Sequence, residues 1–481
     1  MRLFHVILGN FAALLVVAII VVAISFSHSR IADFRELGEL RVATRIDTLS
    51  YRGDKAYAGG FEHDLLVALG QRLGVPVRFV PYPDTAHALE AVIRGEAHLA
   101  AAGLTPDSNL PLAWTTGLRE VDFVLVGRAG SRRTALRDDD LDGRVITVRQ
   151  GTKLAVLMET FKQRIPGLKI AHPAPHTDDQ KLLMQVATGQ VDLLATDQMN
   201  FALAKRLAPK LSIVYDLPFK STVSWAMPLR TGGELSSEIN DFLNESAGNG
   251  LLASTADRYF GHIRRLDHYD ITVFLKRVQA RLPRYVSHFQ DAGEKTGIDW
   301  RYLAAVSYQE SHWDPEATSY TGVRGIMMLT NDTASRLGVE DRLDPKQAIL
   351  GGARYLSMLQ SKLPKEVLHP DRMWMTTAAY NIGPGGLNNA RALARMLGKD
   401  DTAWVELKSV LPLLAQPQYA TRFKSGPVRG GEALIMAENV RNFYDIICHT
   451  YPTERPVLAH SDTQQPPGFQ VSGARLPQPA P

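Results

Sequence analysis

The feature that most constrains the fold is a change of pattern near residue 261. Before it, strand-like and helix-like segments alternate: Leu40–Thr44 and Val75–Val80 read as strands, and Phe61–Gly74 has apolar residues at helical spacing. Such alternation predicts mainly parallel sheets covered by helices. After it, from Tyr269 to Cys448, the pattern is helical almost throughout. The sequence therefore predicts an α/β domain followed by an all-α domain.

The α/β part contains a similar series twice. The segment Lys181–Gly189 before Val191 echoes the segment Ala88–Gly95 before Glu96. Two related lobes are expected within residues 30–268, and the helical domain is expected over residues 269–451. Lys and Arg number 54 against 50 Asp and Glu, a net charge of +4 that is too small to indicate a nucleic-acid binder.

The two ends of the chain carry different signals. Residues 1–29 combine a basic start, the apolar run Phe11–Ile24 and small residues, which is typical of an export signal. If it is not cleaved, the stretch 6–26 could span an inner membrane, since it lies near the lower length limit. Residues 452–481 are rich in proline and are expected to be disordered. The domains are therefore expected to work outside the cytoplasm.

The sequence offers little for a metal or a disulfide. Cys448 is the single cysteine, so an intramolecular disulfide and a metal site of paired cysteines are excluded. It stands in an apolar segment and is expected to be a buried thiol. No cluster of metal ligands is visible, and we expect neither a metal nor another cofactor.

In the first domain, the order of the motifs GELRVAT, GGFEHDLLVALGQRLG, RGEAHLAAAGLT, VRQGTKL and GQVDLLATD resembles the periplasmic solute-binding proteins of the polar-amino-acid type. The resemblance covers about residues 39–265 and implies two lobes that close on a ligand. In that family an arginine after the Thr-Pro step holds the ligand's carboxylate. Here Ser108 stands near that place, which puts the binding of a free α-carboxylate in doubt.

The same resemblance implies further ligand contacts. It points to Thr105, Thr152 and Asp197, with Asp197 receiving an ammonium group and Thr152 helping to hold an anion at a helix start. Thr152 and Asp197 could equally be ordinary helix caps. We expect a peptide-like ligand, such as a muropeptide or a stem peptide.

In the second domain, the helix expected over Asp299–His312 carries an unusual carboxylate. Asp299 suits an N-cap, and the apolar stripe that includes Leu303 continues to Glu310. Burial disfavours the charged form of a carboxyl group and raises its pKa, as a general acid at neutral pH requires. From the spacing alone, Glu310 could also be partly exposed at the helix end or paired with Arg324.

The motifs around this helix are more specific. They are Glu310-Ser311, Gly322–Met328 (GVRGIMM) and Ala378–Asn381 (AAYN), in this order, with Ser319 between the first two. They resemble the lysozyme-like lytic transglycosylases of the Slt type over about residues 285–445. The fold class expected is therefore a two-lobed α/β domain like the periplasmic binding proteins, followed by an all-α lysozyme-like domain.

By position, the resemblance implies that Glu310 is the single catalytic acid/base. It also implies substrate contacts from Ser311, Ser319, Gly325, Met327, Met328, Tyr380 and Asn381. Tyr380 would direct its hydroxyl toward the reacting sugar, unless it is only a core aromatic, and Ser319 could instead serve a turn. The chain departs from the family at Met328, where many members have glutamine, and at Met436, where they have tyrosine.

The resemblance implies cleavage of peptidoglycan glycan strands between N-acetylmuramic acid and N-acetylglucosamine, with formation of 1,6-anhydromuramic ends. A usual glycosidase needs two carboxylates, whereas these motifs carry one, which suffices if a hydroxyl of the substrate attacks. A muramidase that uses water and a receptor that binds glycan or peptide without cutting remain as alternatives. The family favours the periplasmic face of the outer membrane.

Overall fold

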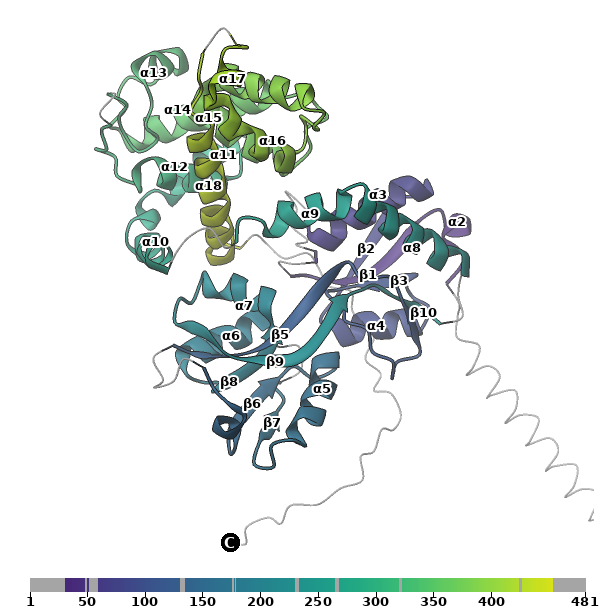
Figure 1. The fold of residues 1–481 in the computed structure, drawn as a ribbon. Helices are drawn as coiled ribbons and strands as arrows, with labels where there is room; N and C mark the ends of the chain where they lie inside the picture. Colours follow the sequence, from purple (N-terminus) through teal and green to yellow (C-terminus); the bar gives the residue numbers. More distant parts are fainter. Residues whose placement is uncertain are drawn as a thin grey trace, which may run out of the picture.

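The computed structural model describes residues 31–47, 50–51, 59–129, 135–174, 177, 179–229, 233–263, 268–319, 322–423 and 426–452 (Figure 1). The predicted leader and all of the predicted tail after residue 452 lie outside the described residues. Within the described ranges, no helix is both long and apolar enough to cross a membrane.

Lobe 1 is built on a five-stranded sheet in the order β2-β1-β3-β10-β4. β1 pairs in parallel with both β2 and β3. Its strands are β1 Leu40–Arg45, β2 Val77–Tyr82, β3 Leu99–Ala101, β4 Leu112–Trp114 and β10 Ala226–Pro228. Its helices are α2 Phe34–Leu37, α3 Phe61–Leu73, α4 Thr85–Ile93, α8 Gly233–Gly248 and α9 Leu251–Phe260. The predicted alternation of strand and helix is confirmed here.

Lobe 2 has a second five-stranded sheet, in the order β7-β6-β8-β5-β9. Its strands are β5 Arg119–Arg128, β6 Val145–Val148, β7 Lys169–Ala171, β8 Leu193–Asp197 and β9 Leu211–Val223. Its helices are η1 Asp138–Leu141, α5 Lys153–Lys162, α6 Asp179–Thr188 and α7 Gln198–Lys205. The long strands β5 and β9 pair antiparallel and carry the chain between the lobes. These hinge strands are not evident from the sequence.

The helical domain follows and confirms the predicted change of architecture. Its elements are α10 His268–Ala280, η2 Leu282–Arg284, α11 Val286–Thr296, α12 Trp300–Ser311, α13 Asn331–Leu337, α14 Pro345–Ser361, α15 Asp371–Met396, α16 Trp404–Val410, η3 Leu411–Ala415, α17 Pro417–Ala420 and α18 Gly430–Thr450. α18 packs against both α12 and α15, so the last helix forms the centre of this domain (Figure 1).

Helix α15 bends at a run of glycine and proline that would ordinarily predict a loop. The run Asn381–Gly386 has the residues of a turn-rich loop, but it lies inside α15, which bends there. Gly383 has φ 75° and ψ 161°, a conformation that glycine adopts without a Cβ clash. Pro384 follows at the start of the second segment, where a missing N–H costs no hydrogen bond. The glycine and proline therefore kink the helix without ending it.

The helical domain holds the end of α9 through α18. Arg441 is fully buried, and its guanidinium donates to the carbonyl oxygens of Asp257 and Arg258 at 2.9 and 2.8 Å. Asn442 donates to the carbonyl of His262 at 2.8 Å. A cation at the carboxyl end of a helix satisfies free carbonyls and complements the helix dipole.

Both lobes contact the helical domain. On the lobe 1 side, Arg258 pairs with Asp64 of α3 at 3.1 Å and with Asp371 at the start of α15 at 3.0 Å. On the lobe 2 side, Arg206, which follows α7, donates to the carbonyl of Asn442 at 2.8 Å and pairs with Asp445 at 3.4 Å. The two lobes and the helical domain therefore form one connected body.

Candidate functional site

The first candidate site is at the end of α12. Asp299 caps the start of this helix by accepting a hydrogen bond from the backbone N–H of Arg301 at 2.9 Å, as the sequence predicts. Most of the helix is buried, including Leu303, which is fully buried. Glu310 lies in the last turn and is half-buried. The stripe that predicts a carboxylate on the apolar face is thus present in the structure.

The environment of Glu310 disfavours the charged form of its carboxyl group. Burial raises the pKa of Glu310 to about 7, and no charged neighbour contributes to this shift. Among the described residues, no hydrogen bond or ion pair joins the Glu310 carboxyl group to another side chain, Arg324 included, which is exposed. The alternative of an Arg324 pair is therefore wrong. An unpaired carboxyl with a pKa near neutrality can both give and take a proton.

The loop Gly322–Leu329 packs beside α12 and is fixed by two serines of that helix. The hydroxyls of Ser307 and Ser311 donate to the carbonyl of Ile326 at 2.9 and 2.8 Å. At Gly325, φ is +84° and a Cβ would collide with the carbonyl of Arg342, so a glycine is required there. The structure thus places Ser311 and Gly325 as supports of this loop.

Tyr380 of α15 closes the other side of the loop. Its hydroxyl donates to the carbonyl of Met327 at 2.6 Å, and Met327 itself is fully buried. The pKa of Tyr380 is raised well above 10, first by burial and then by the charge of Glu310, so the two side chains are electrostatic neighbours. Asn381, the next residue, is exposed. The two distant motifs Gly322–Met328 and Ala378–Asn381 therefore meet beside Glu310.

Ser319 and Met328 complete the predicted set. The hydroxyl oxygen of Ser319 accepts from the backbone N–H of Val323 at 3.2 Å, so it supports the turn that leads into the loop. Met328 is half-buried and has φ 48°. His312 and Trp313 also have positive φ, 54° and 58°. Among the described residues, these are the non-glycine residues with positive φ, and strain of this kind gathers at functional sites.

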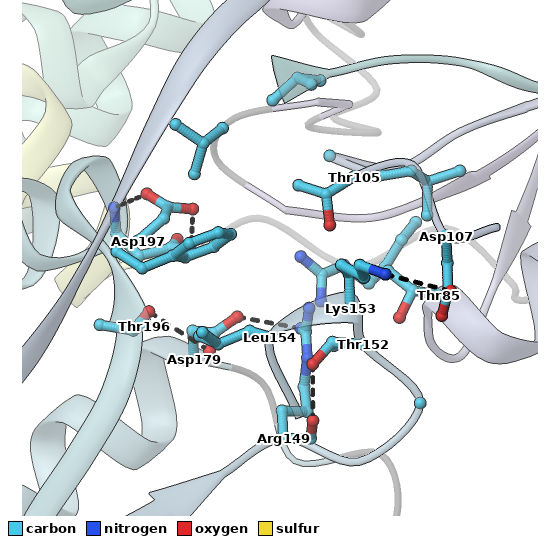
Figure 2. A pocket seen from close by; sticks show the side chains of 18 of the residues that line it. Thr85, Thr105, Asp107, Arg149, Thr152, Lys153, Leu154, Asp179, Thr196 and Asp197 are labelled. Carbon is cyan, nitrogen blue, oxygen red and sulfur yellow. Dashed lines mark hydrogen bonds and ion pairs between the residues drawn. The ribbon is translucent and has the colours of Figure 1, made fainter. Parts of the chain in front are cut away.

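The second candidate site is a pocket between the two lobes. It encloses about 850 Å³ including its open mouth. Thr105 faces it from lobe 1, and Thr152 and Asp197 face it from lobe 2 (Figure 2). Ser108 does not line the pocket and is exposed, because the chain turns outward after Asp107. The structure therefore brings Thr105, Thr152 and Asp197 together, but it does not place Ser108 with them.

Both predicted polar residues of lobe 2 also cap helices. The hydroxyl of Thr152 accepts from the backbone N–H of Ala155 at 3.2 Å. One Asp197 oxygen accepts from the N–H groups of Met199 and Asn200 at 2.7 and 2.8 Å. Capping and pocket lining coincide at these positions, because the amino ends of α5 and α7 point toward the space between the lobes.

The pocket also contains charges that the sequence reasoning missed. Lys153 of lobe 2 pairs across the space with Asp107 of lobe 1 at 3.5 Å, and Arg149 pairs with Asp179 at 3.0 Å (Figure 2). Arg119 of β5 also lines the pocket. Within the described ranges, no group of three His, Cys, Asp or Glu side chains could hold a metal ion. The pocket is therefore suited to an ionic organic ligand.

Comparisons with known proteins find a family match for each of the two domains. Residues 40–262 match the model of bacterial extracellular solute-binding proteins, family 3, and residues 287–402 match the transglycosylase SLT domain. A solved structure described as an ancestral arginine-binding protein bound to arginine is 22% identical, covers 46% of this chain and 98% of its own, and has a TM-score of 0.41.

A two-lobed binding domain and an SLT domain in one chain define the class of the protein as a lytic transglycosylase with a solute-binding-like domain. A membrane-bound lytic murein transglycosylase F from Thiobacillus denitrificans is 36% identical over 96% of this chain and 98% of its own. A membrane-bound lytic murein transglycosylase F 1 from Alkalilimnicola ehrlichii is 39% identical over 90% of this chain and 88% of its own. The chain belongs to the family of membrane-bound lytic murein transglycosylase F.

Proposed function

We propose that the helical domain cleaves peptidoglycan glycan strands between N-acetylmuramic acid and N-acetylglucosamine, with Glu310 as the only catalytic acid/base. The observation that carries this proposal is the unpaired Glu310 carboxyl group with a pKa of about 7. Such a group is protonated often enough to act as an acid and is basic enough, once ionised, to act as a base.

The reaction needs no second carboxylate if the substrate supplies the nucleophile. Glu310 protonates the glycosidic oxygen, and the bond from this oxygen to the anomeric carbon of the muramic acid breaks. The ionised Glu310 then takes the proton of the muramic acid's 6-hydroxyl while that oxygen bonds to the anomeric carbon. The products are a free N-acetylglucosamine end and a 1,6-anhydromuramic end, and no water is consumed.

The alternative of a water-using muramidase has less support. A second carboxylate close to Glu310 would shift its pKa by its charge, and burial is the one cause of the shift. The acidic residues closest in sequence, Asp314 and Glu316, are both exposed. An inverting hydrolase would need such a group to activate water.

The proposed roles of the remaining motif residues follow from their contacts. Tyr380 holds the carbonyl of Met327, and its hydroxyl oxygen can still accept a hydrogen bond from a sugar hydroxyl. Ser319 and Asn381 are proposed as further sugar contacts, because both carry polar groups on segments that lead to the site. Ser311 and Gly325 maintain the loop that these contacts need.

The proposal extends to the location and to the first domain. The names of the relatives describe membrane-bound proteins, and we propose that this chain acts at the periplasmic face of the outer membrane. We further propose that the pocket between the lobes takes a peptide fragment of the wall, because it offers paired charges and four threonine side chains.

Mass spectrometry of the products from purified peptidoglycan sacculi tests the reaction. The protein without residues 1–29 should release products one water lighter than reducing muropeptides, and Glu310→Gln should release at most about a hundredth as much in the same time. Reducing ends would refute the intramolecular reaction in favour of hydrolysis. If neither protein released any product, the cleavage proposal itself would be wrong.

A further inference from the structure

The cations of the inter-lobe pocket are not equivalent. Three of them face a carboxylate at 2.7 to 3.5 Å, in the pairs Arg45–Asp47, Arg149–Asp179 and Lys153–Asp107. The fourth, Arg119, has no carboxylate partner among the described residues. Its recorded hydrogen bond is to the backbone carbonyl of Glu120, at 3.3 Å. A guanidinium in a pocket without an anionic partner is available to an anionic ligand group.

The strand that carries Arg119 aims it into the pocket. Side chains two residues apart share one face of a strand. Arg119, Val121 and Phe123 of β5 follow this rule, and all three line the pocket, whereas Glu120 and Asp122 between them are exposed or point away. Arg119 stands at the first residue of β5, where the chain passes from lobe 1 to lobe 2. The cation therefore reaches the pocket from the hinge.

An opposite charge lies farther along the same face. Phe123 is paired in register with Asp197 on β8. Arg119 is four residues from Phe123, so the two ends of this face are about 14 Å apart along the strand before the side chains reach inward. Burial raises the pKa of Asp197, and the charge of Arg119 is the strongest influence that lowers it again. Arg119 and Asp197 thus act on the same space with opposite charges.

We propose that Arg119 anchors a carboxylate of the ligand in this pocket, and that the ligand is an amino acid or short peptide whose ammonium group faces Asp197. This inference rests on the peptide-binding part of the proposed function. In the related binding proteins the arginine follows the Thr-Pro step, but here that place is the exposed Ser108. The hinge strand supplies the guanidinium instead, so the carboxylate anchor has moved from a lobe to the hinge.

Calorimetric titration of the full-length protein tests this anchor with two probes: a stem peptide released from peptidoglycan, and the same peptide with its carboxyl groups converted to amides. Because a hydrogen-bonded ion pair contributes about 1.5 to 3 kcal/mol, the wild type should prefer the acid form by roughly 10- to 100-fold. Arg119→Gln should lose most of this preference. Arg119→Lys should keep part of it, because the charge remains but the forked geometry is lost.

The matched control is Arg128→Gln, the same substitution on the same strand at an exposed position outside the pocket. It should keep the wild-type preference, and thermal melts should show that all variants fold. A full preference in Arg119→Gln, or no binding of the acid form by the wild type, would overturn the anchor. Neither result affects the sacculus assay, so failure of the anchor and failure of the cleavage proposal can be told apart.

Discussion

Two glutamates with raised pKa values, Glu62 in lobe 1 and Glu310 in the helical domain, make an instructive comparison. Glu62 in α3 of lobe 1 and Glu310 in α12 of the helical domain both continue an apolar helical stripe. Burial raises the pKa of both carboxyl groups to about 7. The two carboxyl groups thus share an apolar helix face and a raised pKa, although Glu62 stands in the first turn of its helix and Glu310 in the last.

Their hydrogen bonds separate them. One Glu62 oxygen accepts from the indole N–H of Trp225 at 3.1 Å, and the other accepts from the backbone N–H of Gly103 at 2.8 Å. Glu310 has no such partner among the described residues, and it lies beside the motifs Gly322–Met328 and Ala378–Asn381. A raised pKa by itself therefore indicates burial, and the absence of hydrogen-bond partners is what distinguishes the Glu310 carboxyl group from that of Glu62.

The largest expected difference between these glutamates is in activity. Glu310→Gln removes the proton donor and should lower the rate of glycan cleavage by about 100- to 10,000-fold. Glu62→Gln is the isosteric control in the other domain and should keep most of the activity. Release of soluble muropeptides from sacculi measures both. Equal losses of activity in the two variants would show that Glu310 has no special role in glycan cleavage.

The next difference is the pH dependence of stability. Glu62 has a folded pKa of about 7 against 4.5 for an ordinary glutamate, so its neutral form stabilises the fold fully below pH 4.5. This contribution is lost as pH rises to about 7, at roughly 1.4 kcal/mol per pH unit. The urea unfolding free energy of Glu62→Gln should therefore fall less steeply over this window than that of the wild type. Parallel slopes would show that Glu62 does not titrate as its burial requires.

At a fixed pH of 5 the two glutamates should differ in stability as well. A glutamine at position 62 turns an NH₂ group toward Trp225 or Gly103, which are both donors, and should cost about 1 to 3 kcal/mol. Glu310→Gln breaks no hydrogen bond and should leave the unfolding free energy unchanged or higher. Chemical unfolding followed by circular dichroism distinguishes the two; a loss at Glu310 as large as at Glu62 would mean that Glu310 has a partner.

The smallest expected effect concerns Tyr380, which closes one side of the loop Gly322–Leu329. Tyr380→Phe removes the hydrogen bond to the carbonyl of Met327 and should destabilise the protein by about 1 kcal/mol. Tyr355→Phe is the matched control, since its ring lies 5.3 Å from that of Tyr380 and its hydroxyl makes no hydrogen bond within the described part of the chain. Tyr380→Phe should also lower glycan cleavage, whereas a pure stability role would leave the rate per folded molecule unchanged.

The sequence predicts a carboxyl group on the apolar face at Glu310, because the helix is long and regular enough for its apolar stripe to be recognised. The same stripe exists at Glu62, yet nothing nearby in the sequence reveals that Trp225 and Gly103 will satisfy it. These partners are 163 and 41 residues away, and only the fold brings them together.

Arg119 was missed for a different reason. Its strand reads RE followed by a nearly continuous apolar run, because the middle of β5 is buried on both faces. The alternation that aims Arg119 inward is thus visible over only a few residues. The bend at Gly383 is equally hard to predict, because glycine and proline signal turns in general, and only the surrounding helix decides whether they end it or kink it.

The hydrogen bonds between α18 and the end of α9 determine whether the α/β part and the helical part can be separated. A cut in the chain between the α/β and helical parts would leave Arg441, which has no exposed surface, without the carbonyls of Asp257 and Arg258. Asn442 would lose the carbonyl of His262 in the same way. The boundary between the two parts thus runs through a shared set of buried polar groups. Each part, if separated, would keep donors or acceptors whose hydrogen-bond partners belong to the other part.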